Sequence, residues 1–68
     1  METVTLHVRG MTCEGCARSV AGVLRAMAGV ASAEVFLNTG EARVRFESEQ
    51  VTPSELKAAV EQAGYEVA

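Results

Sequence analysis

The chain has 68 residues, of which 49% are hydrophobic and 22% are charged, and its formal net charge is −3 at pH 7. A chain of this length buries only about 60% of its unfolded surface, so we expect one small domain over residues 1–68. The negative charge argues against nucleic-acid binding, and no apolar run approaches the roughly 20 residues of a membrane span. Since the first residues also lack the pattern of a signal peptide, we predict a cytoplasmic protein.

The first half of the chain predicts a strand, a helix and a second strand. Residues 3–8 alternate between apolar and polar side chains, which is typical of a half-buried strand. From about residue 14 to residue 27 the apolar side chains recur at the spacing of one helix face, and Gly29 follows as a stop signal. Residues 31–37 alternate again. The expected buried stripe of the helix is Cys16, Val20, Val23, Leu24 and Met27, and the inward side chains of the second strand are Ala33, Val35 and Leu37.

A hairpin and a second helix follow. The segment Asn38-Thr39-Gly40 is a short turn between two alternating runs, the second over residues 42–47, and this pattern indicates a β-hairpin. Thr52 is then an N-cap residue, Pro53 occupies the first helical position, and Glu55 completes a capping box with Thr52. The expected buried stripe of this helix is Leu56, Ala59, Val60 and Ala63.

The order of these elements predicts the fold class. Gly64 ends the second helix, and residues 65–68 are long enough for one short last strand. The resulting order βαββαβ, with right-handed crossovers, gives an α+β domain: a four-stranded antiparallel sheet with both helices on one face, which is the ferredoxin-like arrangement. The other face of the sheet should be open to water and carry Thr5, His7, Glu34, Phe36, Arg43 and Arg45.

The only two cysteines, Cys13 and Cys16, lie where the first strand gives way to the first helix. Unpaired backbone N–H groups and the positive end of the helix dipole favour the thiolate form at such a position. We expect Gly10 and Gly15 to let the backbone bend there and to keep bulk away from the sulfurs. The pair is therefore the candidate chemical site of the chain.

Three chemistries fit two cysteines at this spacing. Copper(I) is a soft ion that accepts two or three thiolates, so Cys13 and Cys16 alone can hold it. Zinc needs four ligands, and after the cysteines only His7 remains as a strong nitrogen ligand, on the face opposite to Val8. Thiol–disulfide exchange also uses a C-x-x-C motif, but the only proline, Pro53, sits in a capping box and not before a strand as in thioredoxin-like proteins.

The motif Gly10-Met11-Thr12-Cys13-x-x-Cys16, followed by a helix and later by Gly64-Tyr65, closely resembles the heavy-metal-associated domain family. This family includes cytosolic copper chaperones and the amino-terminal domains of copper-transporting P-type ATPases, and its fold is the ferredoxin-like one. The resemblance covers almost the whole chain, including the Thr39-Gly40 turn.

The resemblance implies roles for single residues. Cys13 and Cys16 would be the metal ligands, and Met11 would pack beneath the metal loop without binding the ion. Tyr65 resembles the residue that lies near the metal in bacterial copper chaperones, and Thr12 fits the copper pattern of the family. Bacterial chaperones often place a histidine between the cysteines, where this chain has Glu14 and Gly15.

The function implied by this resemblance is that of a copper(I) metallochaperone, which would pass its ion to a copper-transporting P-type ATPase or to the metal-binding domain of one. No catalysis is expected, because no acid, base or nucleophile cluster accompanies the thiols. Copper could also link two copies of the chain into a homodimer. Mercury(II) binding, as in mercuric-resistance domains that share the motif, is the nearest alternative, and a thiol–disulfide redox protein is a further one.

Overall fold

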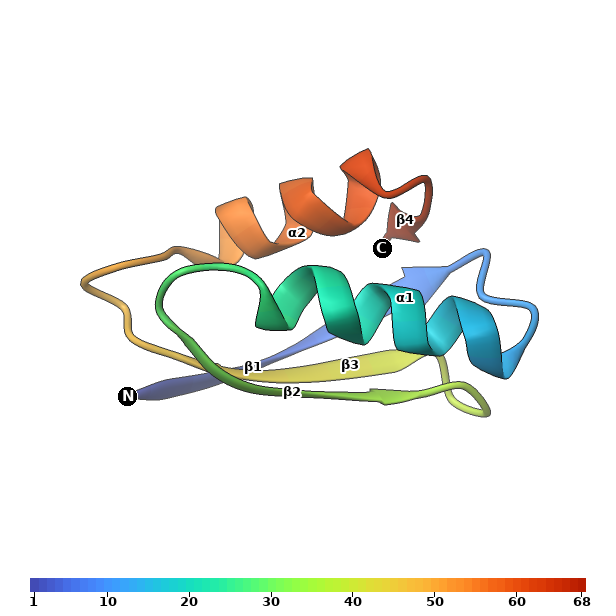
Figure 1. Ribbon diagram of the computed structural model, residues 1–68, viewed down its shortest axis with the longest axis horizontal. Helices are drawn as coiled ribbons and strands as arrows, with labels where there is room; N and C mark the ends of the chain where they lie inside the picture. Colours follow the sequence, from blue (N-terminus) through green and yellow to red (C-terminus); the bar gives the residue numbers. More distant parts are fainter.

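Four strands and two helices make two layers in the computed structural model, which describes all 68 residues (Figure 1). Both helices cover the same face of an antiparallel sheet, in which the strands lie in the order β2-β3-β1-β4. This confirms the predicted ferredoxin-like βαββαβ fold. The elements are β1 (Glu2–Arg9), α1 (Glu14–Arg25), β2 (Val30–Phe36), β3 (Glu41–Phe46), α2 (Pro53–Gln62) and β4 (Glu66–Val67).

The two edges of the sheet differ in length. β1 and β3 pair along most of their length, from Glu2 opposite Phe46 to His7 opposite Glu41. β2 pairs with β3 on the far side and forms one edge over its full length, with a register shift between Val30 and Ser32. β4 has only two residues and pairs with the end of β1. The short pairing of β4 nevertheless brings the end of the chain beside the loop that follows β1.

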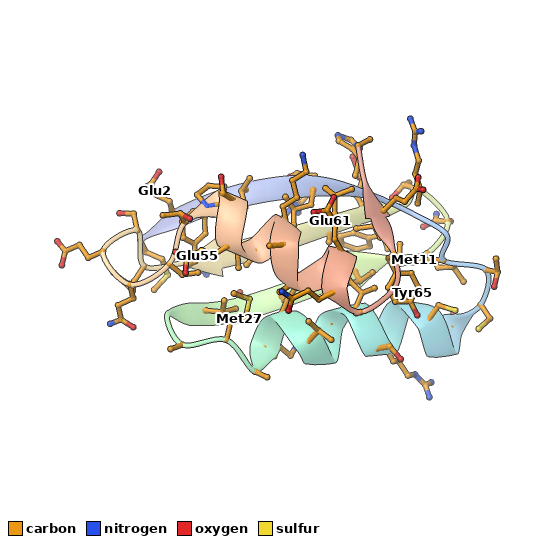
Figure 2. All side chains as sticks on the ribbon, turned by 90° about the horizontal axis from the view of Figure 1, so that it is seen from above. Glu2, Met11, Met27, Glu55, Glu61 and Tyr65 are labelled. Carbon is orange, nitrogen blue, oxygen red and sulfur yellow. The ribbon has the colours of Figure 1, made fainter.

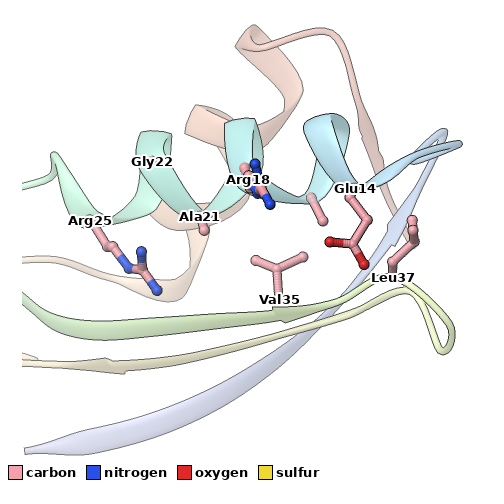
Figure 3. Close-up of a pocket in the computed structure, with 8 residues that line it drawn as sticks. Glu14, Arg18, Ala21, Gly22, Arg25, Val35 and Leu37 are labelled. Carbon is pink, nitrogen blue, oxygen red and sulfur yellow. The ribbon is translucent and has the colours of Figure 1, made fainter.

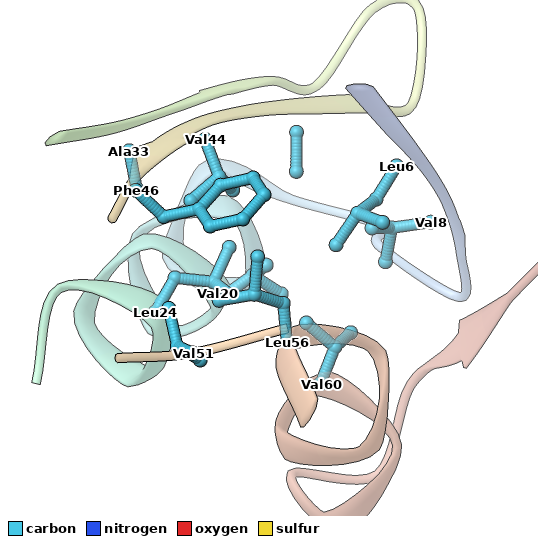
Figure 4. Packing of buried hydrophobic residues seen from close by; sticks show 11 residues of the cluster. Leu6, Val8, Val20, Leu24, Ala33, Val44, Phe46, Val51, Leu56 and Val60 are labelled. Atoms are coloured by element: carbon cyan, nitrogen blue, oxygen red, sulfur yellow. The ribbon is translucent and has the colours of Figure 1, made fainter. Parts of the chain in front are cut away.

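The core lies between the helices and the sheet (Figure 4) and contains no buried polar side chain. Phe46 of β3 packs there with residues of both helices, and this burial is the main stabilising contribution in a domain of this size. The alternation of apolar and polar residues along the strands predicts which sheet residues belong to this core. The core cluster comprises Leu6, Val8, Val20, Leu24, Ala33, Ala42, Val44, Phe46, Val51, Leu56 and Val60.

Helix α1 is shorter than its apolar pattern predicted. It ends at Arg25, with Ala26 as C-cap, so Met27 lies in the following turn and packs half-buried against the core. Gly29, at φ 91°, reverses the chain, since this left-handed conformation favours glycine. The apolar pattern continued past the helix because a turn residue can also contact the core. Two small residues of the buried face, Ala17 and Ala21, were missing from the predicted stripe.

Helix α2 begins as predicted. The Thr52 side chain accepts a hydrogen bond from the Glu55 backbone N–H at 3.3 Å, and the Glu55 carboxylate accepts one from the Thr52 N–H at 3.2 Å. Leu56 and Val60 are fully buried. Ala63 is the C-cap and is exposed, so its predicted place on the buried stripe is wrong: the stripe ends where the helix ends.

The face of the sheet without helices is polar, as predicted. His7, Glu34 and Arg45 are exposed on it. Phe36 is only half-buried, and the Arg43 guanidinium lies 5.7 Å from its ring centroid, within the range of a cation–π contact.

Candidate metal centre

The two cysteines lie side by side at the start of α1. Cys13 is exposed and Cys16 is half-buried, both thiols are free, and their Sγ atoms are 3.4 Å apart. This distance is too long for a disulfide bond and short enough for one soft ion to contact both sulfurs. No group of three or more His, Cys, Asp or Glu side chains is arranged so that it could hold a metal ion, so the ligands that the chain brings together here are these two thiols.

Backbone geometry explains why α1 begins at the cysteines. Cys13 is the N-cap residue, with extended dihedral angles of φ −157° and ψ 169°. Its carbonyl accepts hydrogen bonds from the N–H groups of Cys16 at 3.0 Å and Ala17 at 3.2 Å. No side chain caps this helix end. The first amides of α1 and the positive end of its dipole therefore face the thiols.

The surroundings of Cys16 favour its thiolate form. Its pKa falls from 9.0 to about 6, chiefly because of a hydrogen bond with the backbone of Thr12, then because of the Cys13 thiol and the Tyr65 phenol. The Thr12 hydroxyl, 3.9 Å from Cys16 Sγ, makes a smaller contribution. A thiolate at the helix start was predicted, but its largest hydrogen-bond donor belongs to the preceding loop. At neutral pH Cys16 is thus available as a soft anionic ligand.

Tyr65 and Met11 lie together at the cysteine end of the molecule (Figure 2), and both pack half-buried against the core. The hydrogen bond with Cys16 raises the pKa of Tyr65, so the phenol keeps its proton and donates a hydrogen bond to the thiolate. Gly10, at φ 94°, turns the chain between β1 and Met11. A Cβ at position 10 would lie 3.8 Å from the Tyr65 ring, so the need for glycine comes from the backbone conformation.

The predicted backbone bend at Gly15 is wrong. Gly15 lies inside α1, and its φ is not in the left-handed region. A Cβ at this position would lie 3.6 Å from Cys13 Sγ, which is an ordinary van der Waals contact. The bend is made at Gly10 instead, because the chain must turn before the helix begins at Glu14.

The structure also shows where Ser19, Glu14 and His7 lie relative to the two cysteines. Ser19, which the sequence pattern did not single out, donates a hydrogen bond to the Gly15 carbonyl at 3.0 Å, and its hydroxyl opposes the rise in the pKa of the Tyr65 phenol. Its position three residues after Cys16, on the same side of α1, is the signal that could have revealed it. Glu14 lines a groove between α1 and β2, and His7 lies on the open sheet face opposite Glu41.

The profile of the heavy-metal-associated domain matches residues 5–66. The copper chaperone CopZ of Staphylococcus saprophyticus is 39% identical to this chain over 67 residues, which are 98% of both chains. The copper-transporting ATPase HMA5 of Oryza sativa is 46% identical over 61 residues, which are 90% of this chain but 6% of the ATPase.

Solved structures of similar proteins share the fold. A CopZ metallochaperone superimposes with a TM-score of 0.95 at 36% identity, over 98% of this chain and 100% of the other. Oxidised MerP of Ralstonia metallidurans superimposes with a TM-score of 0.93 at 34% identity, over 98% and 93% of the two chains. Neither helix of the present structure has the length and apolarity that a membrane crossing requires.

Proposed function

Because the chain belongs to the heavy-metal-associated domain family, we propose that it is a copper(I) metallochaperone that binds one ion between Cys13 and Cys16. The observation that carries the proposal is the pair of free thiols, 3.4 Å apart at the uncapped start of α1. Relatives that match along almost their full length are named copper chaperones, which are carriers and not enzymes. The proposed unit is one domain over residues 1–68, acting in the cytoplasm.

The chemistry of the ligands supports copper(I) over harder ions. Thiolates select soft ions, and copper(I) does not require a closed set of four ligands. In this proposal Cys16 supplies a thiolate at neutral pH, while Thr12 and Tyr65 donate hydrogen bonds to it. Met11 supports the loop from below by packing against the core.

The difference in exposure between the thiols suggests how the ion leaves. Cys13 is exposed, whereas Cys16 is half-buried against the Tyr65 side. A cysteine of the acceptor would approach the ion from the exposed side and form a three-coordinate bridge, after which one donor thiol departs. The proposed acceptor is a copper-transporting P-type ATPase or its metal-binding domain. Since the ion passes directly between thiolates, it is never released into water.

The test is an anaerobic titration with copper(I), zinc and mercury(II) against competing chelators. We expect one copper(I) ion to bind tightly per chain and zinc to bind weakly, because the chain offers two thiols and zinc prefers four ligands. The variant that carries both Cys13→Ala and Cys16→Ala should lose tight copper binding and remain folded. Copper binding that is weak in the native chain, or that survives loss of both thiols, contradicts the proposal.

Further measurements on the native protein test the mercury(II), redox and homodimer alternatives. Preference for mercury(II) over copper(I) at equal competition would assign it to mercury handling. Catalytic turnover in an insulin-reduction assay would make it a redox enzyme. Sedimentation velocity of the copper-loaded form would reveal the proposed copper-linked homodimer as a species of twice the mass, which removal of copper should dissociate.

A further inference from the structure

The β2 edge of the sheet has the features of a strand that could pair with another chain. Its segment Val30–Phe36 contains one charged residue, Glu34, and no proline. The Phe36 carbonyl faces the hairpin, where it accepts a hydrogen bond from the Gly40 N–H at 2.9 Å. Since peptide groups alternate along a strand, those of Ala33 and Val35 face outward from β3. Exposed edges of this kind promote association unless a specific feature blocks them.

One side chain occupies the middle of this edge. Arg25, the last residue of α1, donates two hydrogen bonds to the Ala33 carbonyl, from Nε at 3.1 Å and from Nη2 at 2.8 Å. In Figure 3 its side chain extends from the end of α1 toward the sheet. Two donors on one acceptor hold the guanidinium in a fixed orientation. The central outward carbonyl of β2 is therefore unavailable to a neighbouring strand.

The space beside this edge would admit the side chains of an added strand. A groove of about 270 Å³ runs between α1 and β2 (Figure 3), and Ala21, Val35 and Leu37 contribute apolar surface to it. Arg18 and Arg25 line the same groove from α1, but only Arg25 is hydrogen-bonded to the strand. The groove therefore leaves room for association, whereas the Arg25 guanidinium opposes it.

The β2 edge is also complementary to itself. If two copies paired antiparallel about Ala33, each Ala33 would face its counterpart and Glu34 of one copy would face Ser32 of the other. No like charges would then lie directly opposite each other. The two Glu34 side chains would be diagonal neighbours, about 7–8 Å apart, where their repulsion is weaker than between directly opposed charges. The register shift between Val30 and Ser32 disturbs only the beginning of the strand. In the middle of the edge, the contact of Arg25 with the Ala33 carbonyl is what opposes pairing.

We propose that Arg25 blocks the β2 edge. By donating two hydrogen bonds to the Ala33 carbonyl, it prevents β2 of a second copy from pairing with this strand. In this proposal the contact between Arg25 and Ala33 keeps the metal-free protein monomeric. This proposal does not depend on the proposed function, because it concerns an edge that contains neither Cys13 nor Cys16.

The test is sedimentation velocity of Arg25→Ala over a wide range of concentrations, with a chelator and a reductant present so that neither metal nor disulfide can link the chains. We expect the variant to dimerise at least about tenfold more tightly than the native chain, because pairing at Ala33 adds two reciprocal hydrogen bonds. Arg18→Ala is the matched control, since it removes an arginine from the same groove without freeing the carbonyl. Adding Ala31→Lys to Arg25→Ala should restore the monomer, because an edge lysine opposes strand pairing.

Two results would overturn the proposal. One is a folded Arg25→Ala variant that stays as monomeric as the native chain, and the other is equal dimerisation of Arg18→Ala. If Arg25→Ala does not fold, Arg25→Met replaces it, because methionine keeps a long side chain but has no hydrogen-bond donor for the Ala33 carbonyl. A folded Arg25→Met variant must then dimerise more tightly than the native chain. Hydrogen exchange locates the contact: the Ala33 amide, which would pair with Ala33 of the second copy, must exchange more slowly in the dimer than in the monomer, and unchanged exchange there contradicts β2 pairing.

Discussion

The two helices begin in opposite ways, although both follow an extended N-cap residue. At the start of α2 the Thr52 side chain and the Glu55 carboxylate satisfy backbone N–H groups reciprocally, with Pro53 in the first helical turn. At the start of α1 the N-cap residue is Cys13, and no side chain caps the helix. The first helix end is thus left available for a ligand, whereas the second is satisfied by its own residues.

This difference shows how one small fold divides stability from function. A capping box contributes to the stability of the domain whether or not a ligand is present. A cysteine at the N-cap gives up that contribution, and in exchange the amides and the dipole of α1 favour a thiolate. Single substitutions test this division, and the first of them should make the start of α1 resemble the start of α2.

Replacing Cys13 by serine should have the largest effect. Serine is a strong N-cap residue, and the extended backbone of position 13 suits it, so we expect the metal-free domain to gain about 1 kcal/mol in free energy of unfolding. Copper(I) affinity should fall by more than about a hundredfold, since changes outside the ligand set already cost 10–100-fold. Urea unfolding and competitive copper titration measure the two effects. Undiminished affinity would show that Cys13 is not a ligand.

The reverse change at α2 is Thr52→Ala. We expect a loss of about 1 kcal/mol in free energy of unfolding, because the Glu55 backbone N–H loses the Thr52 hydroxyl as its hydrogen-bond acceptor. Copper affinity should stay the same, since the cysteines lie at the start of the other helix. Ser54→Ala, at an exposed position in the same turn, is the control and should change the stability little. A decrease in copper affinity for Thr52→Ala would contradict the proposed division between the two helices.

A smaller effect is expected from Gly15→Ala. The residue has ordinary helical geometry, so alanine should stabilise the domain by about 0.5 kcal/mol through the unfolded chain. Gly22→Ala, at an exposed position of α1 with no neighbouring atom within 4 Å, is the matched control. Both variants should bind copper as the native chain does. Weaker binding by Gly15→Ala alone would mean that glycine is needed to keep space beside Cys13 Sγ.

A further prediction concerns the pH dependence of stability. Because the pKa of Cys16 is about 6 in the fold against 9.0 in the unfolded chain, the unfolded state binds more protons between these values. The stability of the metal-free protein should therefore rise with pH through this window, and the contribution of Cys16 should disappear as the pH falls through 6. Urea unfolding at several pH values measures the slope, which Cys16→Ser should reduce.

Tyr65→Phe tests one cause of the same shift. The variant removes a hydrogen-bond donor to the thiolate, so the pKa of Cys16 should move upward from about 6. Thiolate ultraviolet absorbance against pH measures it. An unchanged pKa would show that the Tyr65 phenol does not act on Cys16, and Thr12 and Cys13 would then account for the shift.

Much of the fold was predictable because its signals are local. The alternation of β1 and β3 and the capping box of α2 depend on residues that are close together in the chain, and the structure confirms them. The helix ends were less predictable. Met27 continued the apolar pattern of α1 but lies in a turn, because contact with the core does not require helical geometry.

The amino-acid sequence by itself determined the order of the elements, the pair Cys13 and Cys16, and their place before a helix, since each depends on local spacing and propensity. Only the tertiary structure decided which distant groups act on them. Tyr65 reaches Cys16 because β4 pairs with β1, and Arg25 reaches the Ala33 carbonyl because α1 packs along β2. These contacts depend on strand register and helix packing, which arise from burial of the whole core and are not encoded in any single segment.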